Sequence, residues 1–140
     1  MSLNVELLES SFNLVAPKAD ELMDRFYGRL FNEHPELRPI FPDDMGDQKK
    51  HLATSLATIV QNLRQPEKLT KYLEDLGLRH VQYKVKREHY PVVGQTLLAA
   101  LAEVAGDAWN AELETAWTDA YGAIQSIIYG ALDAQGQAAA

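Results

Sequence analysis

The sequence contains no cysteine, which excludes a disulfide framework, a thiolate-held metal cluster and a cysteine nucleophile. Basic residues are also scarce, because 13 Lys and Arg stand against 20 Asp and Glu and leave a formal net charge of -7. A surface of this sign offers no basic stripe to neutralise phosphates, so we do not expect nucleic acid as a partner.

Long apolar runs and the common enzyme motifs are missing too. No stretch of about eighteen uncharged apolar residues is present, so we expect no membrane-spanning segment. Residues 1–6 lack the basic start and the apolar run of a signal peptide. A glycine-rich phosphate loop, a His-x-x-x-His pair and a serine elbow are absent as well. These absences predict a soluble, cytoplasmic protein without a readable catalytic motif.

What the sequence does contain is helical periodicity. Apolar residues recur three and four positions apart, and no segment alternates with period two over strand length. Pro17 and Pro91 are expected near helix starts, while Pro35, Pro39 and Pro42 allow only a short turn of helix. With 140 residues, the chain suits one all-α domain of about seven helices. The small, polar tail at 134–140 is expected to fray.

One residue departs from this pattern. His80 lies on the same helical face as Leu69, Leu73, Leu76 and Tyr83, with spacings of four, three, four and three residues. A buried imidazole needs a partner for each ring nitrogen. His80 is therefore either a structural histidine satisfied by ordinary hydrogen bonds, or a metal ligand whose second nitrogen donates to a carbonyl or side chain.

Short segments in all parts of the chain follow one known pattern. They are LGLRHVQYKV at 76–85, HYPVVG at 89–94, FYGRLF at 26–31, HPELRPIF at 34–41, AW at 116–117 and AYG at 120–122. In this order and over this length they resemble the bacterial single-domain globins and the haem domains of flavohaemoglobins. The resemblance implies a globin fold for residues 1–133, packed around one b-type haem.

On the proximal side, the resemblance implies that His80 is the ligand of the haem iron. A single axial imidazole leaves the opposite position open for a small gas. Phe41 matches the ring that packs flat on the haem, and ordinary core packing is the alternative. Further haem contacts are implied for Leu52, Tyr83, Val85, Tyr90 and Val93. Candidates to hold the propionates, or simply solvated surface charges, are Lys49, Arg79 and Lys84.

On the distal side, the resemblance implies that the Tyr27 hydroxyl donates to bound oxygen and so favours O2 over CO. The alternative is a core tyrosine bonded to a carbonyl. Gln48 and Leu52 match the family's distal pair, four residues apart on one helical face. The longer spacing of flavohaemoglobins would instead place His51 in the distal slot. We prefer Gln48, because the match of Gly46-Asp47-Gln48 and the match of Leu52 agree with each other. A distal His51 could also bind the iron and would then have to open for each ligand.

Behind the proximal histidine, flavohaemoglobins have a tyrosine ten residues later and a glutamate on the last helix, joined to the histidine by hydrogen bonds. Tyr90 matches this tyrosine. The glutamate has no match, because Leu132 stands in its position with Asp133 beside it. A carboxylate there would make the imidazole more basic, so we expect a weaker electron push onto the ligand in this chain.

Three functions remain open at this point. The first is reversible oxygen storage or delivery, with NO and CO as further haem ligands. The second is dioxygenation of nitric oxide with a separate reductase, because the sequence includes no flavin or nicotinamide domain. The third is a haem-free helical interaction module, since all-helical folds also serve as scaffolds.

Overall fold

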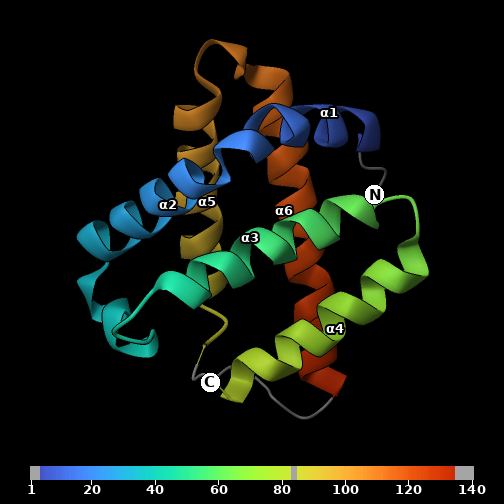
Figure 1. The fold of residues 1–140 in the computed structure, drawn as a ribbon. Helices are drawn as coiled ribbons and strands as arrows, with labels where there is room; N and C mark the ends of the chain where they lie inside the picture. The colour runs from blue at the N-terminus through green and yellow to red at the C-terminus, as the bar shows by residue number, and fades with distance from the viewer. Residues whose placement is uncertain (1–3, 83–84, 135–140) are drawn as a thin grey trace.

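The computed structural model describes residues 4–82 and 85–134, and these ranges form helices without any strand (Figure 1). The α-helices are α1 (Val5–Val15), α2 (Ala19–Glu33), α3 (Gly46–Gln61), α4 (Pro66–Gln82), α5 (His89–Ala105) and α6 (Ala111–Ala134). The short 3-10 helices are η1 (Ala16–Lys18), η2 (Pro35–Ile40) and η3 (Gly106–Ala108). The all-α prediction is confirmed, and η2 is the short turn expected between the prolines. Of the predicted tail, only Ala134 belongs to the described residues.

Local chemistry explains several helix boundaries. The Asn4 side chain accepts a hydrogen bond from the Leu7 amide at 3.1 Å, which caps α1. Pro66 is the first residue of α4, where its missing N–H costs nothing. Gly106, with φ of 58°, ends α5 in the left-handed region that favours glycine. Pro91 lies in the first turn of α5, which begins two residues earlier at His89.

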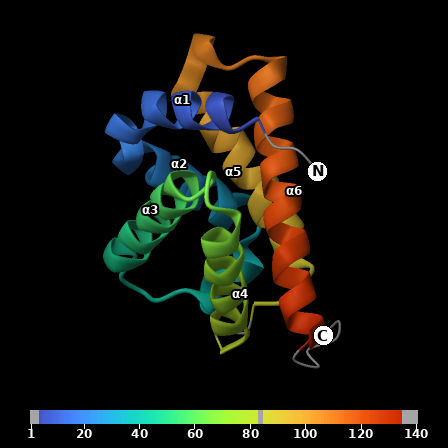
Figure 2. The same cartoon turned by 90° about the vertical axis from the view of Figure 1, so that its right-hand side faces the viewer.

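The helices pack in two main pairs, α4 with α6 and α2 with α5. Figure 2 shows α6 along one side of the molecule, with α1 crossing near its N-terminal end and α4 beside its C-terminal half. None of the helices in the described ranges is long and apolar enough to cross a membrane. The arrangement leaves α6 in contact with α1, α4 and α5 together.

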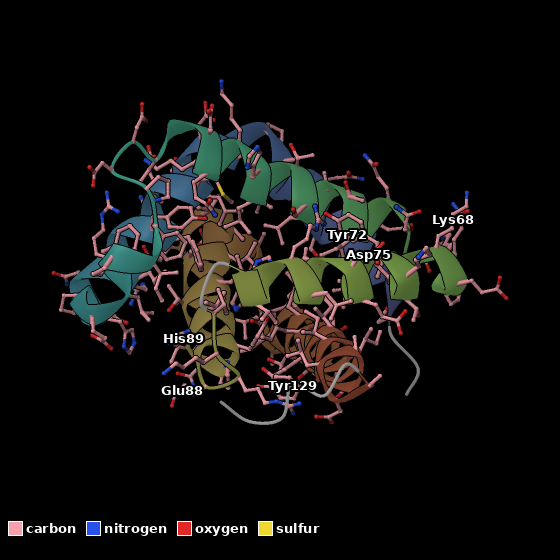
Figure 3. All side chains as sticks on the ribbon, turned by 90° about the horizontal axis from the view of Figure 1, so that it is seen from below. Lys68, Tyr72, Asp75, Glu88, His89 and Tyr129 are labelled. Carbon is pink, nitrogen blue, oxygen red and sulfur yellow. The ribbon has the colours of Figure 1, made fainter. Side chains whose placement is uncertain are left out.

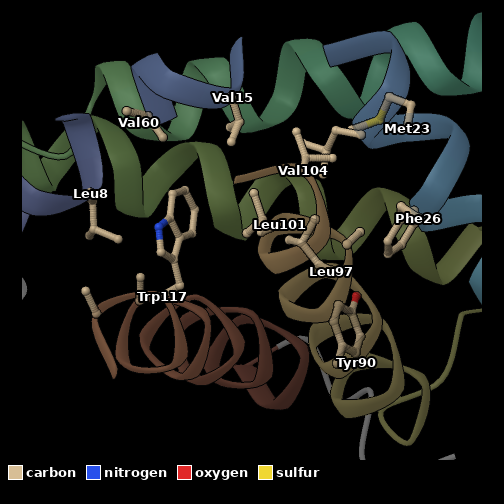
Figure 4. Close-up of a cluster of buried hydrophobic side chains, with 14 of the residues drawn as sticks. Leu8, Val15, Met23, Phe26, Val60, Tyr90, Leu97, Leu101, Val104 and Trp117 are labelled. Carbon is tan, nitrogen blue, oxygen red and sulfur yellow. The ribbon is translucent and has the colours of Figure 1, made fainter. Parts of the chain in front are cut away.

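The core of the described residues is largely apolar, and one of its buried polar side chains, Ser11, takes part in a connection between helices. Its largest fully buried side chains are Leu8, Leu22, Leu30, Leu73, Leu101 and Ile128. Trp117 of α6 lies near Leu8 of α1 (Figure 4), and its indole Nε1 donates to Ser11 Oγ at 2.9 Å. Ser11 Oγ in turn donates to the Leu7 carbonyl at 2.7 Å. This chain of hydrogen bonds ties α1 to α6 without leaving the buried hydroxyl unsatisfied.

Candidate functional site

His80 lies in the last turn of α4 and is partly buried. Its Nδ1 is 2.7 Å from the carbonyl oxygen of Leu76, one turn earlier. A carbonyl can only accept, so Nδ1 carries the proton and the neutral ring has its lone pair on Nε2. Burial lowers the pKa of His80, while the bond to Leu76 opposes this shift. The residue is therefore held as the neutral imidazole, the form that coordinates a metal.

The face of α4 that carries His80 is buried more deeply at Leu69 and Leu73 than near the end of the helix. Leu69 is 8% exposed and Leu73 is 0% exposed. Leu76 and His80 are only partly buried although they share the same stripe. Tyr83, the last member of the stripe, lies outside the described residues. Along the stripe, the exposure of the side chains therefore rises between Leu73 and His80, over about two helical turns.

Tyr27 occupies the middle of α2 and is 3% exposed. Its ring contacts Phe26, Phe31 and Phe41, with centroids 4.8, 5.8 and 5.7 Å away. Burial raises the pKa of the Tyr27 hydroxyl, and the hydrogen bond from Gln48 partly offsets this. The phenol therefore keeps its proton at neutral pH and is able to donate it in a hydrogen bond.

Gln48 lies in the first turn of α3 and reaches across to α2. Its Nε2 donates to the Tyr27 hydroxyl oxygen at 3.2 Å. The tyrosine accepts this bond, so the Tyr27 proton is available for another acceptor. The structure thus brings together Tyr27 and Gln48, which the sequence pattern could connect only by resemblance.

The other two distal candidates lie on different sides of α3. Leu52 is partly buried and packs against the core, one turn after Gln48. His51 is exposed to solvent. In the described part of the chain Gln48 is thus hydrogen-bonded to Tyr27 whereas His51 is exposed, and the distal assignment stays a prediction.

Phe41 follows η2 in extended backbone, with φ of -105° and ψ of 156°. Its ring meets those of Tyr27 and Phe31 edge to face. Arg38 fixes this corner: its guanidinium lies over the Phe31 ring at 5.0 Å and donates to the Pro42 carbonyl at 2.8 Å. Sequence reasoning missed Arg38, because its partners are a ring face and backbone carbonyls that no residue pattern reveals.

Tyr90 lies at the start of α5 and is 8% exposed. Burial, followed by the nearby Tyr129, raises its pKa to about 12. The Tyr129 ring meets it edge to face at 5.8 Å, and the Tyr121 hydroxyl donates to the Tyr90 carbonyl at 2.6 Å. Figure 4 shows the Tyr90 ring below Leu97, within the core. In the described residues, Tyr90 thus has Tyr121 and Tyr129 as partners on α6.

Leu132 and Asp133, at the position compared with the glutamate in the sequence, lie in different surroundings. Leu132 is 5% exposed and belongs to the core. The Asp133 carboxylate forms an ion pair with Arg87, whose guanidinium lies 4.9 Å over the Tyr129 ring. The Tyr129 hydroxyl donates to the Arg87 carbonyl at 2.8 Å. Asp133 therefore binds the segment before α5 through Arg87.

Two further residues predicted to contact the haem are Val85 and Val93. Val85 and Val93 are partly buried, and the Val85 amide donates to the His80 carbonyl at 3.2 Å. His89 begins α5, and its Nδ1 accepts from the Lys86 amide at 3.0 Å. Figure 3 places His89 and Glu88 at the end of the molecule where Tyr129 also lies.

Two of the basic residues considered for the propionates, Lys49 and Arg79, have protein partners. Lys49 Nζ forms an ion pair with Asp24 at 2.8 Å. Arg79 is exposed, and its Nε lies 3.4 Å from the Asp75 carbonyl. Lys84 is outside the described residues. These contacts do not test whether Lys49 or Arg79 binds a propionate, so both assignments stay predictions.

Comparison with known proteins identifies similar sequences and folds. The family model described as Globin matches residues 24–128. A flavohemoprotein of Rhizobium meliloti (strain 1021) is 34% identical over 128 residues, covering 89% of this chain and 32% of the relative. A flavohemoprotein of Bacillus thuringiensis subsp. konkukian (strain 97-27) is 39% identical over 126 residues, covering 86% and 30%. The chain thus spans about a third of the length of these relatives.

Two solved structures are similar over most of their length. A bacterial globin from Campylobacter jejuni has a TM-score of 0.82 and 26% identity, with 94% of this chain and 95% of that chain covered. An engineered carbene transferase, whose Rhodothermus marinus parent is named as a candidate nitric oxide dioxygenase, has a TM-score of 0.79 and 25% identity. The coverage there is 89% of this chain and 87% of that chain.

Proposed function

The chain belongs to the globin family and has the predicted globin fold, and from this premise we propose that it binds molecular oxygen reversibly on a b-type haem. The observation that carries this proposal is the hydrogen bond from Gln48 to the Tyr27 hydroxyl. Because the buried Tyr27 hydroxyl accepts this bond, its own proton is available to donate to a bound ligand. A fixed donor of this kind favours O2, which gains partial negative charge on binding, over CO.

The residues present fit a haem by the chemistry of their donors. His80 offers a neutral imidazole oriented by the Leu76 carbonyl. The side chains predicted to touch the group are apolar or aromatic, and several are partly buried: Phe41, Leu52, Val85 and Val93. A porphyrin needs such an apolar lining together with a donor for its iron. When bound, the haem would supply an iron atom to which a diatomic gas can attach.

The two sides of the site then have separate roles. His80 would hold the iron, and because its Nδ1 donates to a neutral carbonyl, the imidazole is less basic than one bonded to a carboxylate. A less basic imidazole would push fewer electrons onto the haem, which suits reversible binding of a ligand. Tyr27 would donate to the ligand, Gln48 would orient Tyr27, and Leu52 would limit the access of water. Oxygen storage or delivery follows as the proposed role.

The test is an oxygen equilibrium measurement on the haem-reconstituted protein. Absorption spectra should change from a ferrous ligand-free form to an oxygenated form as the oxygen pressure rises, and return when oxygen is removed. Rapid irreversible oxidation in place of this cycle would contradict the proposal. A protein that takes up no haem would instead support the helical interaction module.

A second candidate is dioxygenation of nitric oxide, supported by the similarity to the Rhodothermus marinus protein. The balanced reaction combines NO, O2 and one electron to give nitrate. The electron would come from a separate reductase. Mixing the oxygenated protein with NO, with and without a reductase, separates the two functions. Sustained nitrate formation over many turnovers would favour the enzyme, while a single stoichiometric turnover favours oxygen storage.

A further inference from the structure

Two glycines in the described helices approach α6 too closely to carry a side chain. A Cβ added at Gly77 of α4 would lie 2.7 Å from Ile128 Cγ2, and one at Gly94 of α5 would lie 2.5 Å from the Tyr121 ring. At Gly130, a Cβ would meet nothing within 4 Å. The backbones of α4 and α5 therefore each touch α6 at a glycine.

The contact between Gly77 and Ile128 has little room to relax. Ile128 is 1% exposed, so its side chain is enclosed by the core. Its Cγ2 is bonded directly to Cβ, and a β-branched residue in a helix has one strongly preferred χ1 rotamer. A methyl group at position 77 would therefore displace the backbone of α4 more readily than it would displace Ile128.

The position of Gly77 connects this contact to the histidine. His80 follows Gly77 by three residues, which is less than one helical turn. Leu76, whose carbonyl orients the His80 ring, is the neighbour of Gly77. The α4–α6 pair is also the most extensive helix packing in the described residues. A shift of α4 at Gly77 is thus transmitted to the imidazole by a rigid helix.

Helix α6 holds the chain beyond His80 as well. The Tyr129 hydroxyl donates to the Arg87 carbonyl at 2.8 Å, and the Tyr121 hydroxyl donates to the Tyr90 carbonyl at 2.6 Å. The Tyr121 ring also rests on Gly94. Both the helix before His80 and the segment after it are therefore positioned by α6.

We propose that Gly77 is a positioning residue for His80, because its missing Cβ seats α4 against Ile128 and so sets how the imidazole reaches the iron. In this chain α6 orients the proximal histidine through backbone contacts and close packing. The proposal rests on the proposed function, since it takes His80 as the iron ligand.

The experiment compares Gly77→Ala with Gly130→Ala in the haem-loaded protein. Resonance Raman spectra of the ferrous form report the iron–histidine stretching band, and haem transfer to a scavenging globin reports haem loss. For Gly77→Ala we expect a displaced band and about tenfold faster haem loss. Gly130 is exposed and its Cβ would be free of contacts, so Gly130→Ala should leave both readouts unchanged.

The double variant Gly77→Ala with Ile128→Ala separates positioning from stability. Removing Cγ2 makes space for the new methyl group, so the band should return toward its wild-type position even though the buried cavity lowers stability. A wild-type band in folded Gly77→Ala, or an equally displaced band in the double variant, would overturn the proposal. If Gly77→Ala does not fold, the double variant is compared with wild type, and a displaced band in the folded double variant would overturn the proposal. A wild-type protein without an iron–histidine band would contradict the proposed function instead.

Discussion

Gln48 donates a hydrogen bond from its side-chain amide to the hydroxyl oxygen of Tyr27, with 3.2 Å between the two atoms. The bond connects the first turn of α3 to the middle of α2, 21 residues earlier in the chain. Its direction matters, because a tyrosine that accepts this bond still has its own proton to donate. The two residues therefore have unequal roles, and their variants should differ accordingly.

Tyr27→Phe should accelerate the release of oxygen. The loss of one hydrogen bond to a partly charged ligand corresponds to about 1.5–3 kcal/mol, or roughly 10–100-fold in rate. Carbon monoxide, which gains little charge, should dissociate at nearly the wild-type rate. Stopped-flow displacement measures both rates. An unchanged oxygen dissociation rate would show that the hydroxyl faces another acceptor.

Gln48→Leu and His51→Ala test the distal assignment. Gln48→Leu removes the bond that orients Tyr27, so we expect about threefold to tenfold faster oxygen release. His51 is exposed, and His51→Ala should leave the ferric, ferrous and oxygenated spectra unchanged. The reverse result, with altered spectra for His51→Ala alone, would place His51 in the distal slot.

His80→Gly should abolish stable haem retention, because it removes the proposed axial ligand. Added imidazole should restore haem binding by occupying the space of the lost ring. Circular dichroism of the haem-free variant checks that the helices persist. A variant with stable haem and an unchanged ferrous spectrum would show that another residue is the ligand.

Tyr121→Phe should lower stability without changing the distal chemistry. The substitution removes the donor to the Tyr90 carbonyl, a bond of 2.6 Å, at a cost of about 1–3 kcal/mol in the free energy of unfolding. Urea denaturation of the haem-free protein measures this cost. Stability equal to wild type would indicate that water replaces the hydroxyl.

Leu73→Ala and Leu14→Ala compare the truncation of a buried leucine with that of an exposed one. Leu73 is 0% exposed, so its truncation leaves a cavity and should cost about 2–5 kcal/mol. Leu14 is 58% exposed, and its truncation should change stability by less than about 0.5 kcal/mol. Similar effects for the two variants would contradict the burial of Leu73 in the core.

Part of the site could be anticipated from single residues and their spacing. The apolar period of three and four identified the helices, and it marked His80 as a polar residue on a buried face. Resemblance to globins proposed Tyr27, Phe41 and Gln48 together. Neither approach could anticipate the role of Arg38 at the corner after η2, because its partners are carbonyls and an aromatic face.

By itself, the sequence determined the all-α class, the approximate positions of the helix ends and the residue types available for chemistry. These follow from the apolar periodicity and from proline and glycine, whose effects extend over only a few residues. The tertiary structure decided which of those residues meet. It joined Gln48 to Tyr27, turned His51 to solvent, engaged Asp133 with Arg87 and seated Gly77 on Ile128. These contacts link residues far apart in the chain, and their geometry depends on how whole helices cross, which no local pattern specifies.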